Sequence, residues 1–299
     1  MSPQHTTALR ARASELTFED LTMPVDDLVR HSRYPMQVFP SKGEFYEWLA
    51  REMADELKER NEQGLPTRWL LPVGPKSHYP ILADICNRER ISWKNVYAFH
   101  MDEFLDWQGR EVPEDHPFSF RGYCNKHLYA HLDPELRPEP ENIVFPTMKD
   151  VDAFSARIAA EGGLDTAFAG FGYRGHIAFN EPPSTRWHRY TVEDLAASKT
   201  RVVPLLEDTI VAHSHRSTGG YTQAIPPMAL TVGMADFLAA RRIRLLTDGG
   251  PWKQYILRIV ALTEERDVNF PVTLVHGHPN VDIAVDAASA APLPLELHP

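Results

Sequence analysis

Apolar residues recur at helical spacing between residues 41 and 61, in a stretch that is otherwise polar and charged. Ser41 opens this stretch and Glu44 follows three residues on, which is the pattern of a helix-capping box. Gly64 and Pro66 come directly afterwards and favour the end of the helix. The pattern therefore predicts a long helix over residues 41–61.

Farther along the chain, short apolar runs alternate with helix-like segments. This alternation is typical of a layered, mostly parallel sheet. We therefore expect an α/β fold, with a Rossmann-like open sheet and helices on both of its faces. The expected strands are 68–71, 95–101, 164–171, 241–247, 271–275 and 281–285, and the expected helices are 77–88, 150–161 and 252–262.

The first 35 residues differ from the rest, because they are polar and carry only short apolar clusters. We expect residues 1–35 to form an N-terminal extension. No internal repeat, long linker or low-complexity segment interrupts the remaining sequence. Residues 36–299 are therefore expected to form a single α/β domain, which their number allows.

Acidic residues outnumber basic ones, 41 Asp and Glu against 31 Lys and Arg, so the 299-residue chain has a formal charge of −10. Such a surface repels phosphate backbones, and we expect neither nucleic acid nor a membrane as a partner, although a small basic pocket remains compatible with it. Two cysteines are too few for a disulfide framework or a Cys-rich zinc site. No apolar run approaches the roughly 20 residues that span a bilayer, and the first residues lack a signal-peptide core, so we expect a cytoplasmic protein.

Chemically reactive side chains follow four of the expected strands. In open α/β sheets, ligands bind outside the carboxyl ends of the strands. These residues should therefore surround one pocket, which is the main reason to expect an active site. The four segments are Val73-Gly74-Pro75-Lys76, Asp102-Glu103, Gly172-Tyr173-Arg174-Gly175-His176 and Asp248-Gly249-Gly250.

Two of these segments carry candidate acid–base groups. His176 and Glu181 share a loop rich in glycine and proline, and a nearby carboxylate can orient a histidine that moves protons. Asp102, shielded by Met101 and Phe104, would have a raised pKa and could act as a general base. The alternatives are a structural histidine that satisfies loop carbonyls and an aspartate that caps a helix. The predicted proximity of Asp102 to His176 favours catalysis.

Two other segments could bind an anion. Gly74 with Lys76, and Gly249 and Gly250 with Lys253, offer free backbone N–H groups beside an ammonium group. The alternative is a pair of loops in which the glycines only permit turns and the lysines are solvated.

Two cofactor signals are present, but their context is unfavourable. The run from Gly170 to Gly175 matches G-x-G-x-x-G, yet Pro182 and Pro183 leave no room for the helix that a dinucleotide site needs. His-x-His pairs occur at 213–215 and 276–278, without the further ligand spacing of known metal motifs. We therefore expect neither a metal nor a cofactor.

Taken in order, these segments resemble the glucosamine-6-phosphate deaminase (isomerase) family, which is related to the 6-phosphogluconolactonases. The resemblance extends from about residue 36 to residue 285. The most specific match is Gly175-His176-Ile177-Ala178-Phe179-Asn180-Glu181-Pro182. The other matches are Ser92-Trp93-Lys94-Asn95-Val96, Phe99-His100-Met101-Asp102-Glu103-Phe104, Asp115-His116-Pro117 with Ser119, and Ala229-Leu230-Thr231-Val232-Gly233.

The resemblance implies a metal-free aldose–ketose isomerisation of a small anionic sugar, coupled to loss of ammonia. His176, oriented by Glu181, would open the sugar ring, and Asp102 would abstract the C2 proton. Lys253 matches a lysine that contacts the substrate phosphate, and Glu103 and Gly175 are carried over with their motifs as substrate-binding positions. Members of the family are often oligomeric, so the resemblance also admits a homo-oligomer.

The chain departs from the family pattern at three places around the expected pocket. Arg174 stands where the family has an aspartate that helps ring opening; if Arg174 is close to His176, it should lower the pKa of that histidine. The phosphate loop contains Lys76 in place of threonines. A family arginine aligns with His215, and the adjacent Arg216 could replace it.

Two hypotheses follow from these departures. In the first, the protein is an isomerase or deaminase whose specificity is altered from glucosamine 6-phosphate, with an anionic group of the substrate facing Arg174 and Lys76. In the second, it is a sugar-phosphate-binding regulator or pseudoenzyme that has lost ring opening. The retained Asp102, His176 and Glu181 favour the enzyme. Under either hypothesis the pocket gathers Lys76, Arg174, Arg216 and Lys253.

Overall fold

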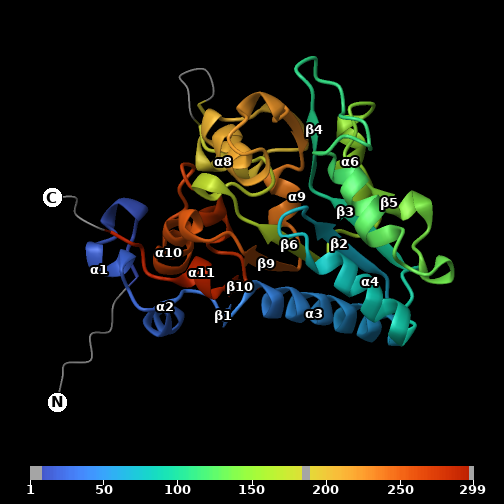
Figure 1. Cartoon of the computed structure of the whole chain (residues 1–299), viewed down its shortest axis with the longest axis horizontal. Coiled ribbons are helices and arrows are strands. Elements are labelled where there is room, and N and C mark those ends of the chain that lie inside the picture. The colour runs from blue at the N-terminus through green and yellow to red at the C-terminus, as the bar shows by residue number, and fades with distance from the viewer. Residues whose placement is uncertain (1–8, 184–188, 296–299) are drawn as a thin grey trace.

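A seven-stranded, all-parallel sheet forms the centre of the computed structural model, which describes residues 9–183 and 189–295 (Figure 1). Its strand order is β1-β10-β9-β6-β2-β3-β5. This arrangement confirms the expected open, mostly parallel α/β sheet. The strands are β1 Met36–Phe39, β2 Thr67–Leu71, β3 Val96–His100, β5 Ile143–Val144, β6 Thr166–Gly170, β9 Arg242–Thr247 and β10 Val281–Asp286.

Helices cover both faces of this sheet (Figure 1). On one face, α3 (Lys42–Glu62) and α4 (His78–Glu89) pack on a core that includes Trp69 and Phe168. On the other, α6 (Val151–Ala160) and α10 (Gln254–Leu262) share the larger core. Both cores consist of strand residues that alternate between the two faces, as the pleat of a buried sheet requires.

A second, three-stranded antiparallel sheet was not expected from the sequence. It consists of β4 (Asp102–Leu105), β8 (Met228–Thr231) and β7 (Arg201–Pro204), in the order β4-β8-β7. Its small core contains Phe104, Phe179 and Leu205. Because β4 begins directly after β3, Asp102 lies at the corner where the two sheets meet.

The predicted elements can be compared with the structure one by one. The strands and helices expected between residues 41 and 262 are present, with ends that differ by a few residues. The strand expected at 271–275 is wrong, since Pro271–Val275 forms a short 3-10 helix. Pro271 fixes the first position of that turn, and the Thr273 hydroxyl donates to the Phe270 carbonyl at 2.8 Å, which stabilises local backbone turns.

Residues 9–35 pack on the rest of the molecule through α1 (Phe18–Leu21) and α2 (Val25–His31), both of which contact α10. Leu28 is fully buried, and the Arg33 N–H donates to the Ala261 carbonyl at 2.7 Å. The first eight residues lie outside the described residues. Within the part that the structure describes, no helix is long and apolar enough to cross a membrane.

The remaining short helices join these layers. They are α5 Phe120–Cys124, α7 Val192–Ala196, α8 Glu207–Ser217, α9 Met234–Leu238 and α11 Ala287–Ala290. Of these, α8 contributes to the functional site, and it was missed because only Thr209 and Ser214 of its residues are buried. A helix that buries so little apolar surface has almost no hydrophobic period.

Candidate active site

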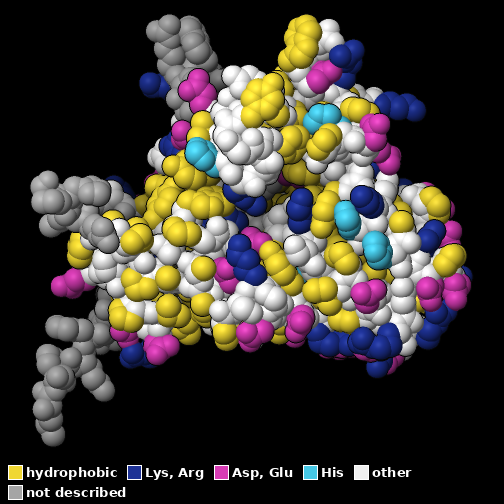
Figure 2. Space-filling view, in the orientation of Figure 1, with side chains coloured by type: hydrophobic (Ala, Val, Ile, Leu, Met, Phe, Trp, Pro, Cys, Tyr) yellow, Lys and Arg dark blue, Asp and Glu magenta, His cyan; other side chains and the backbone are white. Residues whose placement is uncertain are grey.

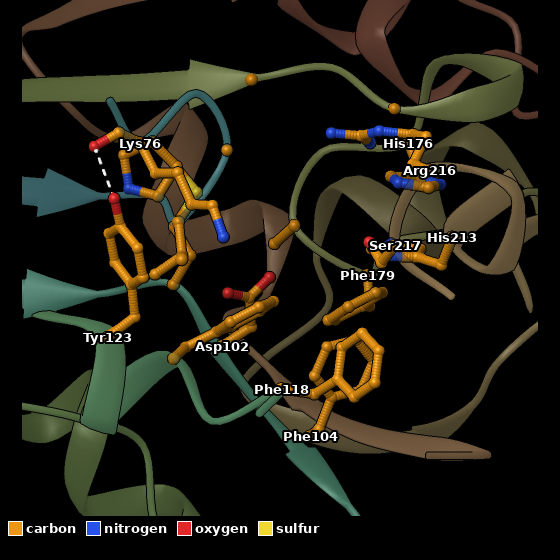
Figure 3. A pocket seen from close by; sticks show the side chains of 18 of the residues that line it. Lys76, Asp102, Phe104, Phe118, Tyr123, His176, Phe179, His213, Arg216 and Ser217 are labelled. Carbon is orange, nitrogen blue, oxygen red and sulfur yellow. Dashed lines mark hydrogen bonds between the residues drawn. The ribbon is translucent and has the colours of Figure 1, made fainter. Parts of the chain in front are cut away.

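A cavity of about 290 Å³ opens at the carboxyl ends of β2, β3, β6 and β9 (Figure 3). This is the edge of the sheet where the sequence predicted a pocket. In the space-filling view, Lys and Arg side chains gather around the hollow in the middle of this face (Figure 2). The chemically active lining residues are Lys76, Asp102, His176, His213, Arg216, Asp248 and Lys253.

Asp102 provides a buried carboxyl group in this cavity. In Figure 3 it points into the space between Lys76 on one side and His176 and Arg216 on the other. Only 6% of the residue is exposed. Burial, and after it the nearby Glu103 carboxylate, raise the pKa of Asp102 well above its usual range. Asp102 therefore holds a proton more readily than an ordinary carboxylate, a property of a general base that must keep the proton it removes.

His176 and Glu181 lie side by side at the ends of one short loop. His176 Nδ1 is 3.6 Å from Glu181 Oε1, both atoms are buried, and among the described residues neither has a hydrogen-bond partner. The second carboxyl oxygen of Glu181 accepts from the Leu206 N–H at 2.7 Å. The carboxyl group is thus held by the backbone beside one ring nitrogen, and the other nitrogen, Nε2, lies against Gly172, which also lines the cavity.

Burial shifts both members of this pair toward their neutral forms. Burial, followed by the positive charges of His213, Lys253 and Arg216, lowers the pKa of His176 to about 3. Burial also raises the pKa of Glu181 to about 7. A neutral imidazole beside a carboxyl group that titrates near neutrality can share and pass on one proton.

Glycine at position 172 is needed for this geometry. A Cβ atom at Gly172 would lie 1.8 Å from His176 Nε2. The Gly172 N–H also donates to the His176 carbonyl at 2.9 Å and closes the loop. The second glycine of the G-x-G-x-x-G match therefore allows the His176 imidazole to pack against the backbone.

Three cations, Lys76, Arg216 and Lys253, also line the described part of the cavity. Lys76 Nζ lies 4.4 Å from the centre of the Tyr123 ring, and burial followed by the charge of Arg216 lowers the pKa of Lys76. Lys253 is 5% exposed, with Nζ 3.9 Å from Asp248 Oδ1. Three cations beside one neighbouring carboxylate give this part of the site an excess of positive charge.

Some of the residues that were expected to bind substrate do not line the cavity. Gly74 lines the cavity, but Glu103, Gly175 and His215 do not. The Glu103 carboxylate accepts from the N–H groups of Phe104, Phe120 and Arg121, each at 2.9 Å. It therefore anchors the first turn of α5 and, through it, the wall of the cavity.

The orientation of α8 determines which of two adjacent residues, His215 or Arg216, reaches the cavity. His213 and Arg216 lie three residues apart on the side of α8 that lines the cavity, whereas His215 is exposed elsewhere on the helix. The structure thus brings Arg216 to the site in place of the aligned His215. In the described ranges, no group of three or more His, Cys, Asp or Glu residues is placed to hold a metal ion.

Arg174 does not line the cavity, contrary to the expectation that it would gather there with the other cations. Its backbone is left-handed, with φ 55°, and its guanidinium group lies 3.4 Å from Asp208 Oδ2 in a neighbouring groove. This conformation and this ion pair turn Arg174 away. The pKa of His176 is lowered by burial and by His213, Lys253 and Arg216 instead.

Two contributors to the site were missed from the sequence. Asp248 was named in a segment expected at the pocket but was given no role there, although it follows strand β9 as Asp102 follows β3. The aromatic wall could not be anticipated, because Phe118 and Phe120 reach the cavity only through the anchored α5 segment, opposite Phe179.

The parallel α/β fold and this cavity are typical of an enzyme. Comparison with known proteins supports this conclusion. The glucosamine-6-phosphate deaminase of Parabacteroides distasonis is 30% identical over 263 residues, covering 85% of this chain and 89% of the relative. That of Aeromonas hydrophila is 34% identical over 211 residues, covering 68% and 72%. The chain therefore belongs to the glucosamine-6-phosphate deaminase family.

Solved structures show the same fold. The structure of a monomeric glucosamine-6-phosphate deaminase superimposes with a TM-score of 0.70 at 26% identity, covering 85% of this chain and 98% of that one. A 6-phosphogluconolactonase from Shewanella baltica gives a TM-score of 0.58 at 18% identity, covering 84% and 97%. No family model matches the chain.

Proposed function

We propose that this enzyme is an aldose–ketose isomerase and deaminase that converts a 2-amino-sugar phosphate into a ketose phosphate and ammonia. One observation carries the proposal: Asp102, His176 and three cations line a single cavity, and Glu181 lies beside His176 just outside it. The names of the relatives support the same reaction.

The size of the cavity restricts the substrate. Its volume of about 290 Å³ is at the lower end of the range for small-molecule sites. One sugar ring with one phosphate group fits that space, whereas a nucleotide sugar would need much more. The cavity volume therefore favours a monosaccharide phosphate as the substrate.

Ring opening is the work of His176. Its neutral Nε2 takes the proton of the C1 hydroxyl group, and the electrons of that O–H bond form the C1 carbonyl as the bond from C1 to the ring oxygen breaks. The proton then passes from His176 to the ring oxygen. Glu181 holds the other ring nitrogen and stabilises the imidazolium that forms in between.

Proton transfer between the two carbons is the work of Asp102. The carboxylate removes the proton from C2, the C–H electrons form a C1–C2 double bond, and the carbonyl oxygen takes a proton from the C2 ammonium group to give an enolamine. Return of the proton to C1 leaves an imine at C2, which water hydrolyses to a ketone and ammonia. The ammonium group of the arriving substrate is a cation that favours the ionised Asp102 needed for the first step.

The phosphate group pairs with Lys76, Arg216 and Lys253. A sugar phosphate carries roughly −1.5 to −2 charges at pH 7, and three cations beside the Asp248 carboxylate offer a net charge of similar size. Because Arg174 lies in the neighbouring groove, a second anionic group on the substrate is not required. We place the altered specificity at the phosphate end, where Lys76 supplies a charge in place of hydroxyl donors.

A panel of amino-sugar phosphates and sugar phosphates, assayed for ammonia and for ketose, tests the proposal. Turnover of a 2-amino-sugar phosphate is expected, and Asp102→Asn should abolish most of it. Turnover of no member, together with an Asp102→Asn variant indistinguishable from wild type, contradicts the proposal. Calorimetric binding without any product would support a sugar-phosphate-binding regulator instead.

A further inference from the structure

Lys253 is the most enclosed cation of the cavity. It ends the short 3-10 turn Pro251–Lys253 between β9 and α10, and 5% of it is exposed. Its aliphatic chain passes directly over Gly249, where a Cβ atom would lie 2.5 Å from Lys253 Cδ and Cε. The ammonium group lies 4.9 Å from the centre of the Trp252 ring. The path of the side chain is therefore fixed before any ligand arrives.

One carboxylate is in contact with this ammonium group. Asp248 Oδ1 is 3.9 Å from Lys253 Nζ, and Asp248 itself lines the cavity. The other carboxyl oxygen, Oδ2, accepts a hydrogen bond from the Tyr46 hydroxyl group of α3. Asp248 is thus held from one side by α3 and presented to Lys253 from the other.

The charges around Lys253 come from every element packed against it. Arg216 on α8 and Lys42 on α3 oppose its charge, and His176 and His213 face the same cavity. Asp248 and Asp286 favour its charge. Asp286 is already engaged, since its carboxylate accepts from the Ser289 N–H at 3.0 Å and caps α11. Asp248 is therefore the carboxylate that remains for Lys253.

We propose that Asp248, held by Tyr46, is a positioning residue that keeps Lys253 charged and directed at the substrate phosphate. This inference rests on the proposed function, because it assigns the anion that Lys253 receives. Asp248 serves as the counter-ion of Lys253 in the empty site, and the phosphate takes over that role on binding. Its contribution belongs to substrate capture and not to the proton transfers.

The pH dependence follows from these contacts. Burial lowers the pKa of Lys253 to about 8, and Asp248 opposes that shift. In the free wild-type enzyme, Lys253 loses its charge as the pH rises through this value, so kcat/KM should fall there. Without the Asp248 carboxylate the pKa of Lys253 drops further, and the fall should begin at lower pH. Bound phosphate replaces the missing charge, so kcat should change little.

The experiment measures kcat and KM from pH 6 to 9 for wild type, Asp248→Asn and Tyr46→Phe. Asp248→Asn should move the alkaline fall of kcat/KM down by at least about one pH unit, raise KM about tenfold at pH 8 and leave kcat within about threefold. Tyr46→Phe should shift the same limb in the same direction by a smaller amount, because the carboxylate remains but is less firmly held.

The chain offers a matched control. Asp236 on α9 is also buried, lies 3.9 Å from Lys199 Nζ and accepts from the Ser155 hydroxyl group, but it does not line the cavity. Asp236→Asn should leave the pH profile unchanged. If the alkaline fall of kcat/KM in Asp248→Asn occurs at the same pH as in wild type, or if kcat is lost while KM is unchanged, the inference is overturned.

Binding of inorganic phosphate separates this inference from the proposed function. Calorimetry at pH 8 should show weaker phosphate binding by Asp248→Asn than by wild type, whether or not any sugar phosphate is turned over. Equal affinities for phosphate at pH 8 overturn the role of Asp248. Failure of wild type to turn over any sugar phosphate contradicts the proposed function alone.

Discussion

Burial favours the neutral forms of both the acid–base groups and the lysines of the cavity, but the two sets have different partners. On the acid–base side, burial moves Asp102, His176 and Glu181 toward their neutral forms. On the cationic side, Lys253 is equally buried, yet it is kept near a carboxylate, and Lys76 lies over an aromatic ring. A neutral imidazole can accept a proton, whereas a group that holds an anion needs a positive charge, which a nearby carboxylate favours. The same depth of burial thus serves two purposes, depending on which partners are supplied.

The largest effect is expected from removal of the carboxylate that moves the C2 proton. Asp102→Asn keeps the size of the side chain but removes the base, so kcat should fall about 1,000-fold while KM stays within about threefold. Steady-state ammonia release measures both values. A rise in KM of similar size to the loss of kcat would show that Asp102 contributes to substrate binding, and it would contradict the distinction between acid–base and cationic groups.

Glu181→Gln should give the next largest loss. The pKa of Glu181 is raised to about 7, so its carboxylate form becomes populated as the pH rises through that value, and kcat/KM should rise with it. The amide cannot ionise, so the rise of kcat/KM near pH 7 should disappear and kcat should fall about 10- to 100-fold. A pH–rate profile that keeps the limb near pH 7 would show that another group titrates there.

Lys76→Met tests the cationic side. Loss of one charge from the anion site should raise KM about tenfold, leave kcat within about twofold and weaken the dependence of KM on salt. Kinetics at two salt concentrations measure the change. Lys149→Met, which removes an exposed lysine outside the cavity, is the control and should match wild type.

Arg174 should give the smallest effect, because it lies outside the cavity. Its charge lowers the pKa of Glu181, so Arg174→Asn should move the limb near pH 7 to higher pH by less than about one unit. Asparagine tolerates the left-handed backbone at this position, where φ is 55°. KM should stay within about twofold. A tenfold rise in KM would mean that Arg174 reaches the substrate.

The acid–base side could be predicted from the sequence because it is local. His176 and Glu181 are five residues apart in one loop, and Asp102 directly follows a strong apolar strand. The cationic side depends on how distant segments meet. Whether His215 or Arg216 faces the cavity is set by the rotation of α8, and the direction of Arg174 is set by one left-handed residue.

In the fold, too, some elements could be predicted from the sequence and others could not. The parallel sheet was predicted because its buried strands are continuous apolar runs bounded by turns. The antiparallel β4-β8-β7 sheet was missed, since its strands have four residues each and β7 carries no fully buried residue. Strands of four residues leave little pattern in the sequence whether buried, as β4 is, or half-exposed, as β7 is, and here β4 holds Asp102 at the corner of the site.

The most direct test follows the C2 hydrogen itself. A 2-amino-sugar phosphate deuterated at C2 is incubated with wild type and with Asp102→Asn, and the loss of deuterium from C2 is measured by NMR. The account predicts that wild type removes the label with a primary isotope effect and that the variant removes it about 1,000-fold more slowly. Equal rates of label loss in the two proteins would contradict the assignment of Asp102 as the base.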